Sequence, residues 1–219
     1  MKHVLLALLF VVTPLWTQLR AQPTPDRWEK DIAAFEKANK KLMSKPGGIV
    51  FYGSSSVRRW DVKKAFPDLP VVNRGFGGST MADAIRHVDR AVLPLKPRLI
   101  LLYEGDNDIG RGMTPPMVVQ DYQRFVKKVH DALPETKIAF ICIKPSLRRI
   151  HLLTQMRGAN MAIREITEQD ELLSYIDVDT PSIGPDGAPM RDLFVDDLLH
   201  LTPKGYEIWT KVIRPYLID

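Results

Sequence analysis

The sequence predicts an α/β protein of three layers, α/β/α, in which helices cover both faces of a five-stranded parallel sheet. Five short apolar runs alternate along the chain with longer segments whose apolar residues recur at helical spacing. Runs that are apolar almost throughout are typical of strands covered on both faces. Because strands and helices alternate along the chain, we expect parallel strands with right-handed connections.

Five strands and five main helices are predicted. The strands are Ile49–Tyr52, Val71–Asn73, Leu99–Tyr103, Ile138–Ile143 and Tyr175–Val178. The helices are Trp28–Met43, Met81–Val92, Pro116–Leu133, Leu152–Glu168 and Pro203–Tyr216. Local signals support these ends: Pro46 and two glycines stop the first helix, Ser79 or Thr80 caps the second, and Thr114 with two prolines opens the third.

The first 21 residues are expected to be a secretory signal peptide. Lys2 and His3 precede the apolar run Val4–Val12, and a polar stretch ends in the small residue Ala21. That order is typical of a signal sequence, and the run is too short to span a bilayer comfortably. We expect cleavage after Ala21, a single domain over residues 22–219 without a permanent membrane span, and a periplasmic or secreted bacterial protein.

Charge and cysteine content narrow the class of protein. The formal net charge of +5 includes two cations of the predicted signal peptide, and the remaining basic residues are spread along the chain. This mild balance gives no reason to expect a nucleic-acid partner. The one cysteine, Cys142, cannot form an internal disulfide. Because it lies in an apolar strand, we expect a buried, unreactive thiol.

Polar residues gather where the predicted strands end. Ligands of parallel α/β sheets bind beyond the carboxyl ends of the strands. The first three strands are followed by the serine run 54–56, the glycine-rich stretch 73–79 and a Gly-Asp-Asn-Asp stretch at 105–108. After the fifth strand, Asp197 and His200 lie three residues apart. These loops supply a hydroxyl, backbone N–H groups, a carboxamide and an acid–imidazole pair, which are the parts that acyl transfer needs.

Each of these stretches also has a simpler interpretation. Serine is common in capped turns, and the glycines could serve tight turning alone. A dinucleotide site is disfavoured because Thr80 stands where G-x-G-x-x-G needs its last glycine. Asp106 with Asp108, or Asp197 with His200, could bind metal or form surface ion pairs, although no dense cluster of ligands accompanies them in the sequence. Acyl transfer by a serine requires neither a metal nor an organic cofactor.

Taken together, the four stretches resemble the SGNH (GDSL-type) hydrolase superfamily. Its four blocks match Ile49–Ser55, Asn73–Gly78, Gly105–Asp108 and Asp197–His200, in the family's order and across nearly all of the chain after the signal peptide. The resemblance implies a flavodoxin-like three-layer fold with a five-stranded parallel sheet.

The resemblance also assigns roles to residues. It places the nucleophile on Ser55, the general base on His200 and the orienting acid on Asp197. It forms the oxyanion hole from the backbone N–H groups of Ser55 and Gly78 and the side chain of Asn107. We therefore expect a catalytic triad Ser55-His200-Asp197, without a cofactor or metal site.

Two further points concern the match. The family has Asp before the nucleophile where this chain has Ser54, which can alter hydrogen bonding in the turn and leaves Ser56 as a second candidate nucleophile. The stretch Lys144–Arg149 resembles the Ile-Lys-Pro-Ser segment of a bacterial branch of the family and is expected to line the pocket. Trp60 and Trp209 are expected to pack in the core.

The predicted function is a serine esterase or acylhydrolase that cleaves carboxylic esters. Small-molecule, lipid and saccharide acyl esters all fit, so a lysophospholipase, a thioesterase and a carbohydrate O-acetyl esterase are alternatives. A non-catalytic binding module, or a flavin or nucleotide binder, is the alternative from another class. The sequence fixes neither the acyl chain nor the alcohol, and it leaves the oligomeric state open.

Overall fold

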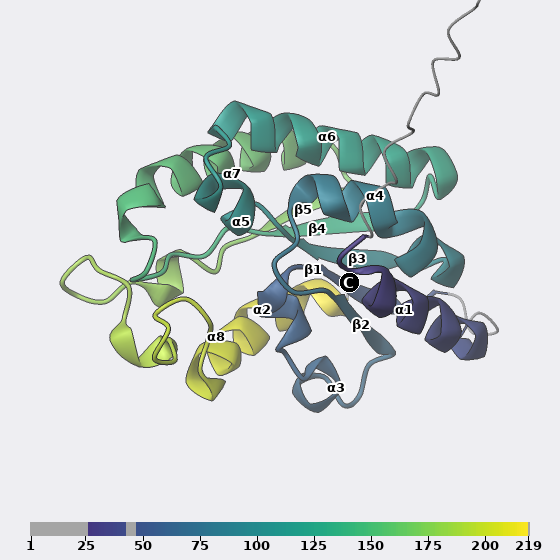
Figure 1. Ribbon diagram of the computed structural model, residues 1–219, viewed down its shortest axis with the longest axis horizontal. Coiled ribbons are helices and arrows are strands. Elements are labelled where there is room, and N and C mark those ends of the chain that lie inside the picture. Colours follow the sequence, from purple (N-terminus) through teal and green to yellow (C-terminus); the bar gives the residue numbers. More distant parts are fainter. Residues whose placement is uncertain (1–25, 43–46, 219) are drawn as a thin grey trace, which may run out of the picture.

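The computed structural model describes residues 26–42 and 47–218. Its sheet has the strand order β2-β1-β3-β4-β5, and every neighbouring pair is parallel (Figure 1). This confirms the predicted five-stranded parallel sheet and the three-layer α/β/α class. The strands are β1 (Ile49–Gly53), β2 (Val71–Gly75), β3 (Leu99–Tyr103), β4 (Lys137–Ile141) and β5 (Leu173–Ile176).

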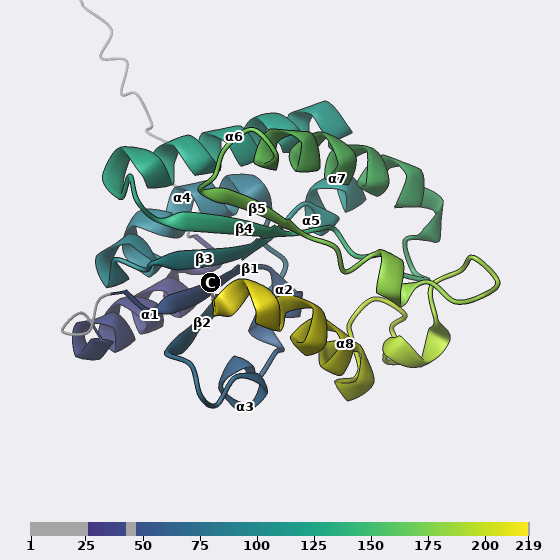
Figure 2. The same ribbon diagram turned by 180° about the vertical axis from the view of Figure 1, so that it is seen from behind.

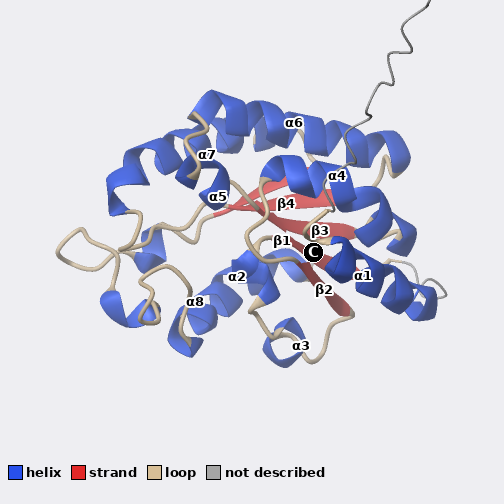
Figure 3. Cartoon of the chain, in the orientation of Figure 1, coloured by secondary structure: helices blue, strands red, loops and turns tan. Residues whose placement is uncertain are grey.

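Helices cover both faces of the sheet, as Figure 3 shows with its red strands between blue helices. One layer contains α1 (Glu29–Leu42), α4 (Met81–Ala91), α6 (Pro115–Ala132) and α7 (Leu153–Thr167). The view from behind in Figure 2 brings α8 (Pro203–Ile213) to the front, below β3 and β4. The short α3 (Val62–Ala65) lies beside β2.

Several short helices have no counterpart in the prediction. The one-turn helices α2 (Ser55–Arg58) and α5 (Asp106–Gly110) begin almost directly after β1 and β3. Elements of four or five residues are too short to show a helical period, which is why periodicity does not find them. Single 3₁₀ turns occupy Leu93–Leu95, Ile150–Leu152, Thr180–Ser182, Arg191–Leu193 and Arg214–Leu217.

Alternate side chains of the central strands fill the two core layers. Phe51 of β1 faces the α8 side, where its ring stacks 5.5 Å from Phe66 and meets Trp60 edge-on at 5.2 Å. The next residue, Tyr52, points to the other face and donates to the carbonyl oxygen of Ala84 in α4 (2.9 Å). Every residue of β1 and β3 is buried, as their apolar sequences predict.

The fourth and fifth strands end earlier than predicted because side chains take over their backbone hydrogen bonds. Past β4, the N–H and C=O groups of Ile143 both bond to the amide of Asn160 in α7 (2.8 and 2.9 Å). Past β5, the Asp177 carboxylate accepts the N–H groups of Asp179 and Thr180, which turns the chain. The strand therefore runs over Leu173–Ile176 rather than Tyr175–Val178.

The helix ends differ from the prediction by small amounts. The last helix becomes a 3₁₀ turn at Arg214, where Pro215 has no N–H to continue the α-helical ladder. The signal peptide predicted for residues 1–21, and Met43 at the predicted end of the first helix, lie outside the described residues. Among the residues that are described, no helix is both long and apolar enough to cross a membrane.

Cys142 is buried directly after β4. Its sulfur accepts the N–H of Val178 at 3.3 Å, and none of the side chain reaches solvent. Burial raises the pKa of the thiol to about 12. Trp60 and Trp209 are buried as well, with ring centres 5.7 Å apart, so both belong to the core as predicted.

Candidate active site

The strand order places the predicted site loops beside one another. In the order β2-β1-β3-β4-β5, the chain passes from β1 to β2 toward one edge of the sheet, then crosses back to β3 and continues to β4 and β5 toward the other edge. The order of the strands thus reverses between β1 and β3. At such a switch point the loops after the two strands diverge to opposite faces and leave a crevice. Ser55 follows β1 and Asn107 follows β3, so both residues lie at that crevice.

A tight turn presents Ser55. Gly53 ends β1 with φ +133°, and a Cβ atom there would lie 2.1 Å from the carbonyl oxygen of Tyr103, so only glycine fits. The carbonyl of Ser54 accepts the N–H groups of Val57 and Arg58 (both 3.0 Å), which closes the first turn of α2. Ser54 and Ser56 are each 2% exposed, whereas Ser55 is only partly buried. Of the three serines, Ser55 is therefore the most accessible.

The imidazole of His200 joins Ser55 to Asp197. Its Nε2 lies 2.9 Å from Ser55 Oγ, and its Nδ1 lies 2.5 Å from Asp197 Oδ2. No hydrogen bond of His200 to the second candidate, Ser56, is present among the described residues. The structure thus brings together a hydroxyl and an acid–imidazole pair that are separated by more than half of the chain.

The loop that carries the pair is held by its own backbone. Val195 donates to the carbonyl of His200 (2.9 Å), and a bridge between Phe194 and Leu201 closes the loop at its base. Between the acid and the imidazole, Leu198 has φ +59°, a backbone conformation that is uncommon for a side chain of this kind. Strain of this kind tends to occur at functional sites.

Hydrogen bonds determine the charge of Asp197. Partial burial raises the pKa of its carboxyl, but the His200 ring and the N–H groups of His200 and Leu199 (both 2.9 Å) more than offset this and hold the pKa well below its usual value. An ionised carboxylate can only accept, so His200 must carry its proton on Nδ1 and present Nε2 to Ser55 as an acceptor.

The Gly77–Gly78 peptide is held from one side. Its carbonyl, that of Gly77, accepts the indole N–H of Trp28 (3.0 Å) and a guanidinium N–H of Arg27 (3.3 Å). The N–H of a trans peptide points opposite to its C=O. The N–H of Gly78 therefore points away from Trp28. Gly78 itself has φ +74°, which favours glycine.

The amide of Asn107 is fixed at both of its atoms. Nδ2 donates to the carbonyl of Ser79 (2.9 Å), while Oδ1 accepts from the guanidinium of Arg149 (3.2 Å). A guanidinium has no acceptor atom, so the oxygen must face Arg149. The second N–H of Nδ2 has no acceptor among the described residues. The same holds for the backbone N–H groups of Ser55 and Gly78.

The stretch Lys144–Arg149 supports α5 rather than simply lining a pocket, which corrects the prediction for Lys144. The ammonium of Lys144 is 1% exposed and lies 2.7 Å from Asp106 Oδ2, and Arg149 bonds to the other oxygen of the same carboxylate. Burial alone would raise the pKa of Asp106, but the two cations lower it overall. Sequence reasoning missed this network because its members are 38 and 43 positions apart.

A buried carboxyl, Glu104, lies behind the same loops. It has no solvent exposure; its Oε1 accepts the Ser79 hydroxyl (2.5 Å), and its Oε2 has no partner among the described residues. Burial, with Asp108 nearby, raises the pKa of Glu104 well above its ordinary value. Asp108 is also buried, and its pKa rises to about 6 although it accepts the N–H groups of Met81 and Gly105.

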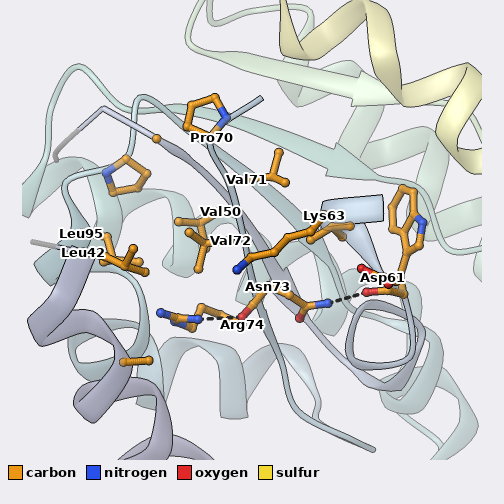
Figure 4. A pocket seen from close by; sticks show the side chains of 15 residues that line it. Leu42, Val50, Asp61, Lys63, Pro70, Val71, Val72, Asn73, Arg74 and Leu95 are labelled. Carbon is orange, nitrogen blue, oxygen red and sulfur yellow. Dashed lines mark hydrogen bonds between the residues drawn. The ribbon is translucent and has the colours of Figure 1, made fainter. Parts of the chain in front are cut away.

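Within the described part of the chain, no group of three or more His, Cys, Asp or Glu side chains is arranged to hold a metal ion. A cavity of about 460 Å³ lies along the edge strand β2 (Figure 4). It is lined by residues 70–74 of that edge, by Leu42 of α1, by residues 60–63 and by Leu95, and by none of the five predicted site residues.

Comparisons with known proteins identify the family and the fold of the chain. Residues 46–208 match the model of the GDSL-like Lipase/Acylhydrolase family. A search of curated proteins gave no match. Among solved structures, a GDSL-like lipase from Bacteroides thetaiotaomicron superposes with a TM-score of 0.74 at 17% identity, covering 85% of this chain and 96% of the other.

Two other solved structures have the same fold. A lipase/acylhydrolase from Enterococcus faecalis has a TM-score of 0.66 at 21% identity, covering 78% of this chain and 95% of the other. A carbohydrate esterase family 3 protein from Talaromyces cellulolyticus has a TM-score of 0.63 at 18% identity, covering 78% and 96%. The family match extends over most of the sequence and includes all five predicted site residues. The chain belongs to the GDSL-like lipase/acylhydrolase family of hydrolases.

Proposed function

We propose that this hydrolase is a serine esterase that cleaves carboxylic esters with Ser55 as its nucleophile. The observation that carries the proposal is the hydrogen-bonded chain from Ser55 Oγ through His200 to Asp197, with distances of 2.9 and 2.5 Å. A serine is a weak nucleophile by itself, and an adjacent, oriented base is what activates it.

The reaction follows from these positions. Ser55 Oγ attacks the acyl carbon while His200 Nε2 takes its proton, and the imidazolium that forms is stabilised by the ionised Asp197. His200 then returns the proton to the leaving alcohol. In the second half, His200 takes a proton from water, which attacks the acyl-enzyme and releases the acid and free Ser55.

The developing negative charge is held by three donors. In this proposal these are the N–H groups of Ser55 and Gly78 and the free N–H of the Asn107 amide, none of which has another acceptor among the described residues. Donors that are oriented before the reaction lower the barrier because no reorganisation is needed, and losing one costs about 3–4 kcal/mol.

The alcohol and acyl groups are less closely defined. Acyl esters fit the family, and the carbohydrate esterase among the structural neighbours favours a saccharide ester as a second candidate substrate. Lysophospholipids and thioesters are further alternatives. We also propose that the protein acts outside the cytoplasm, because its first 21 residues have the pattern of a signal peptide.

Replacing the nucleophile tests the proposal. Ser55→Ala is expected to abolish hydrolysis of 4-nitrophenyl acetate and labelling by a fluorophosphonate probe, while circular dichroism and thermal unfolding stay unchanged. Ser56→Ala is the matched control, because it removes a hydroxyl one position away and should retain both activities. Mass spectrometry of the labelled protein should find the probe on Ser55.

Two results would overturn the assignment. Full turnover by a folded Ser55→Ala protein would remove Ser55 from the mechanism. A wild-type protein that neither hydrolyses any of a panel of esters nor reacts with the probe would instead be a binding module on this fold.

A further inference from the structure

The exposed arginines of this protein fall into two groups. Ten arginines are exposed in the described structure, and six of them lie within 3.6 Å of a carboxylate oxygen: Arg58, Arg86, Arg124, Arg157, Arg164 and Arg191. The other four pair with no carboxylate of the described residues; they are Arg27, Arg59, Arg111 and Arg148. The undescribed residues contain a single acidic side chain, that of Asp219.

Two of the four lie against the loop after β2. Arg27 donates to the carbonyl of Gly77 (3.3 Å), and Arg111 donates to the carbonyl of Gly78 (2.7 Å). Each guanidinium has five N–H donors, so each retains donors after this contact. The loop itself is held to the end of β1, because Phe76 donates to the carbonyl of Gly53 (2.8 Å).

Of the other two, Arg59 directly follows α2, the helix that carries the nucleophile, and Arg148 lies in the loop after β4 and bonds through its backbone to the loop that carries the base. Arg59 caps α2, and its backbone N–H donates to the carbonyl of Ser55 (3.0 Å). Its charge acts on Tyr206, whose hydroxyl donates to the carbonyl of Ser56 (2.8 Å). The backbone N–H of Arg148 donates to the carbonyl of Leu198, inside the Asp197–His200 loop (3.0 Å).

Each of the four arginines thus lies on, or donates a hydrogen bond to, a loop beside Ser55, while three acids of the surrounding segments are already paired. Asp197 bonds to His200, Asp106 to Lys144 and Arg149, and Asp196 lies 3.6 Å from Arg191. A site rimmed by charges of one sign attracts ligands of the opposite sign and raises their association rate, by about tenfold or more in favourable cases.

We propose that these four arginines form an anion-binding rim and that the ester substrate carries a negative charge, a carboxylate or a phosphate, beside the scissile bond. Guanidinium groups suit this role because their planar fork matches both oxyanions. The inference rests on the proposed esterase function and specifies the chemical class of its substrate. It places no constraint on whether the charge belongs to the acyl part or to the alcohol.

Matched esters test the proposal and locate the charge. The first pair is 4-acetoxybenzoate and its neutral amide, 4-acetoxybenzamide; the second is the mono-4-nitrophenyl ester of adipic acid and 4-nitrophenyl hexanoate. Each kcat/KM is divided by the spontaneous hydrolysis rate of that ester. In about 0.01 M salt, we expect a preference of about tenfold or more for the charged member of at least one pair. In about 1 M salt the preference should vanish, because the Debye length falls to about 3 Å.

Charge-removing variants identify the residues responsible. Arg27→Gln, Arg59→Gln, Arg111→Gln and Arg148→Gln should each lower the ratio of charged to neutral ester, and the fourfold variant should abolish the preference. The matched control is Arg124→Gln on α6, which removes the same charge from an exposed arginine paired with Asp121 (3.0 Å). Its ratio should equal that of the wild type.

Results that contradict the anion-binding rim can be told apart from results that contradict the esterase function. Equal rates for charged and neutral esters in both pairs, by an active enzyme, would overturn the anion rim and leave the esterase intact. So would a preference that the fourfold variant retains. If no ester is hydrolysed, titration calorimetry can still test whether the arginines bind an anion, with 4-acetoxybenzoate as the ligand and Ser55→Ala as the protein. Binding that does not weaken with salt would overturn the anion-binding rim. Equal binding after all four arginines are also replaced would overturn it as well.

Discussion

At the scale of single residues, Asn107 shows how neighbours define the chemistry of a side chain. Its amide oxygen is taken by Arg149 and one of its N–H groups by Ser79, so a single N–H remains for a ligand. Arg149 also bonds to Asp106, which Lys144 keeps ionised. A buried network of charged groups therefore sets the orientation of one uncharged amide.

Arg149 should therefore act through Asn107. Arg149→Met is expected to lower kcat for 4-nitrophenyl acetate about tenfold or more with little change in KM. Without Arg149 the amide of Asn107 is misdirected, and its N–H group stabilises only the negative charge that develops in the transition state. In an Asn107→Ala background the same change should have almost no further effect, since the two residues act as a unit. Steady-state kinetics of the four proteins measure this. Equal losses in both backgrounds would show that Arg149 has a purely structural role.

Glu104 should make stability depend on pH. A carboxyl whose pKa is raised in the folded state stabilises the fold fully below its unfolded pKa, near 4.5, and loses that contribution as the pH rises through the higher folded value. Glu104→Gln cannot ionise. Its free energy of unfolding should match that of the wild type near pH 4 and exceed it at pH 9. Urea denaturation at both pH values measures this difference. If the free energies of unfolding of the two proteins changed in parallel between the two pH values, the pKa of Glu104 would not be raised by folding.

At the scale of elements, α8 connects the base to the core. The helix begins soon after His200, and Thr202 caps it by accepting the N–H of Gly205 (3.3 Å). On its buried face, Trp209 lies 5.1 Å from the ring of Tyr103 in β3. Tyr206 reaches from the same helix to the carbonyl of Ser56. One helix thus fixes the His200 loop relative to both the sheet and the nucleophile turn.

Removing Trp209 should loosen that connection. Trp209→Ala is expected to lower the free energy of unfolding by about 3–5 kcal/mol, the usual cost of deleting a fully buried aromatic ring. Glu207→Ala, at an exposed position of the same helix, is the control and should change stability by less than about 0.5 kcal/mol. Urea unfolding followed by far-ultraviolet circular dichroism measures both. A loss below about 1 kcal/mol for Trp209→Ala would mean that α8 packs more loosely than its burial indicates.

At the scale of the whole molecule, the site depends on contacts between distant parts of the chain. Ser55 and His200 are 145 positions apart, and Trp28, near the start of the described residues, reaches Gly77 across 49 positions. The site is therefore complete only when both ends of the domain are in place. The predicted cleavage after Ala21 would leave Trp28 and this contact in the mature chain.

Processing of the amino terminus can be checked directly. Expressed in full length in a bacterium, the protein is expected to leave the cytoplasm and to begin at Gln22, as intact-mass spectrometry of the exported fraction would show. Leu8→Arg interrupts the apolar run and should leave an uncleaved protein in the cytoplasm, whereas the conservative Leu8→Ile should not. Export that is unaffected by Leu8→Arg would exclude a signal peptide here.

The sequence was most informative where local pattern and tertiary structure coincide. Strands buried on both faces, such as Leu99–Tyr103, can be read from their apolar residues alone. The four short blocks located the segments that carry the serine, the glycine turn, the amide and the acid–imidazole pair. The end of β5 was misplaced because Asp177, not hydrophobicity, terminates it. Contacts such as Arg149 with Asn107 depend on the folded arrangement of distant segments, and no spacing in the sequence encodes them.

Cys142 has a practical consequence. It is the only thiol of the chain, it is sealed beside β4, and burial suppresses its thiolate. A thiol reagent can reach it only when the central sheet opens, so its rate of alkylation reports the opening of the core. The native sequence therefore contains a reporter of its own conformational opening, and no label has to be introduced.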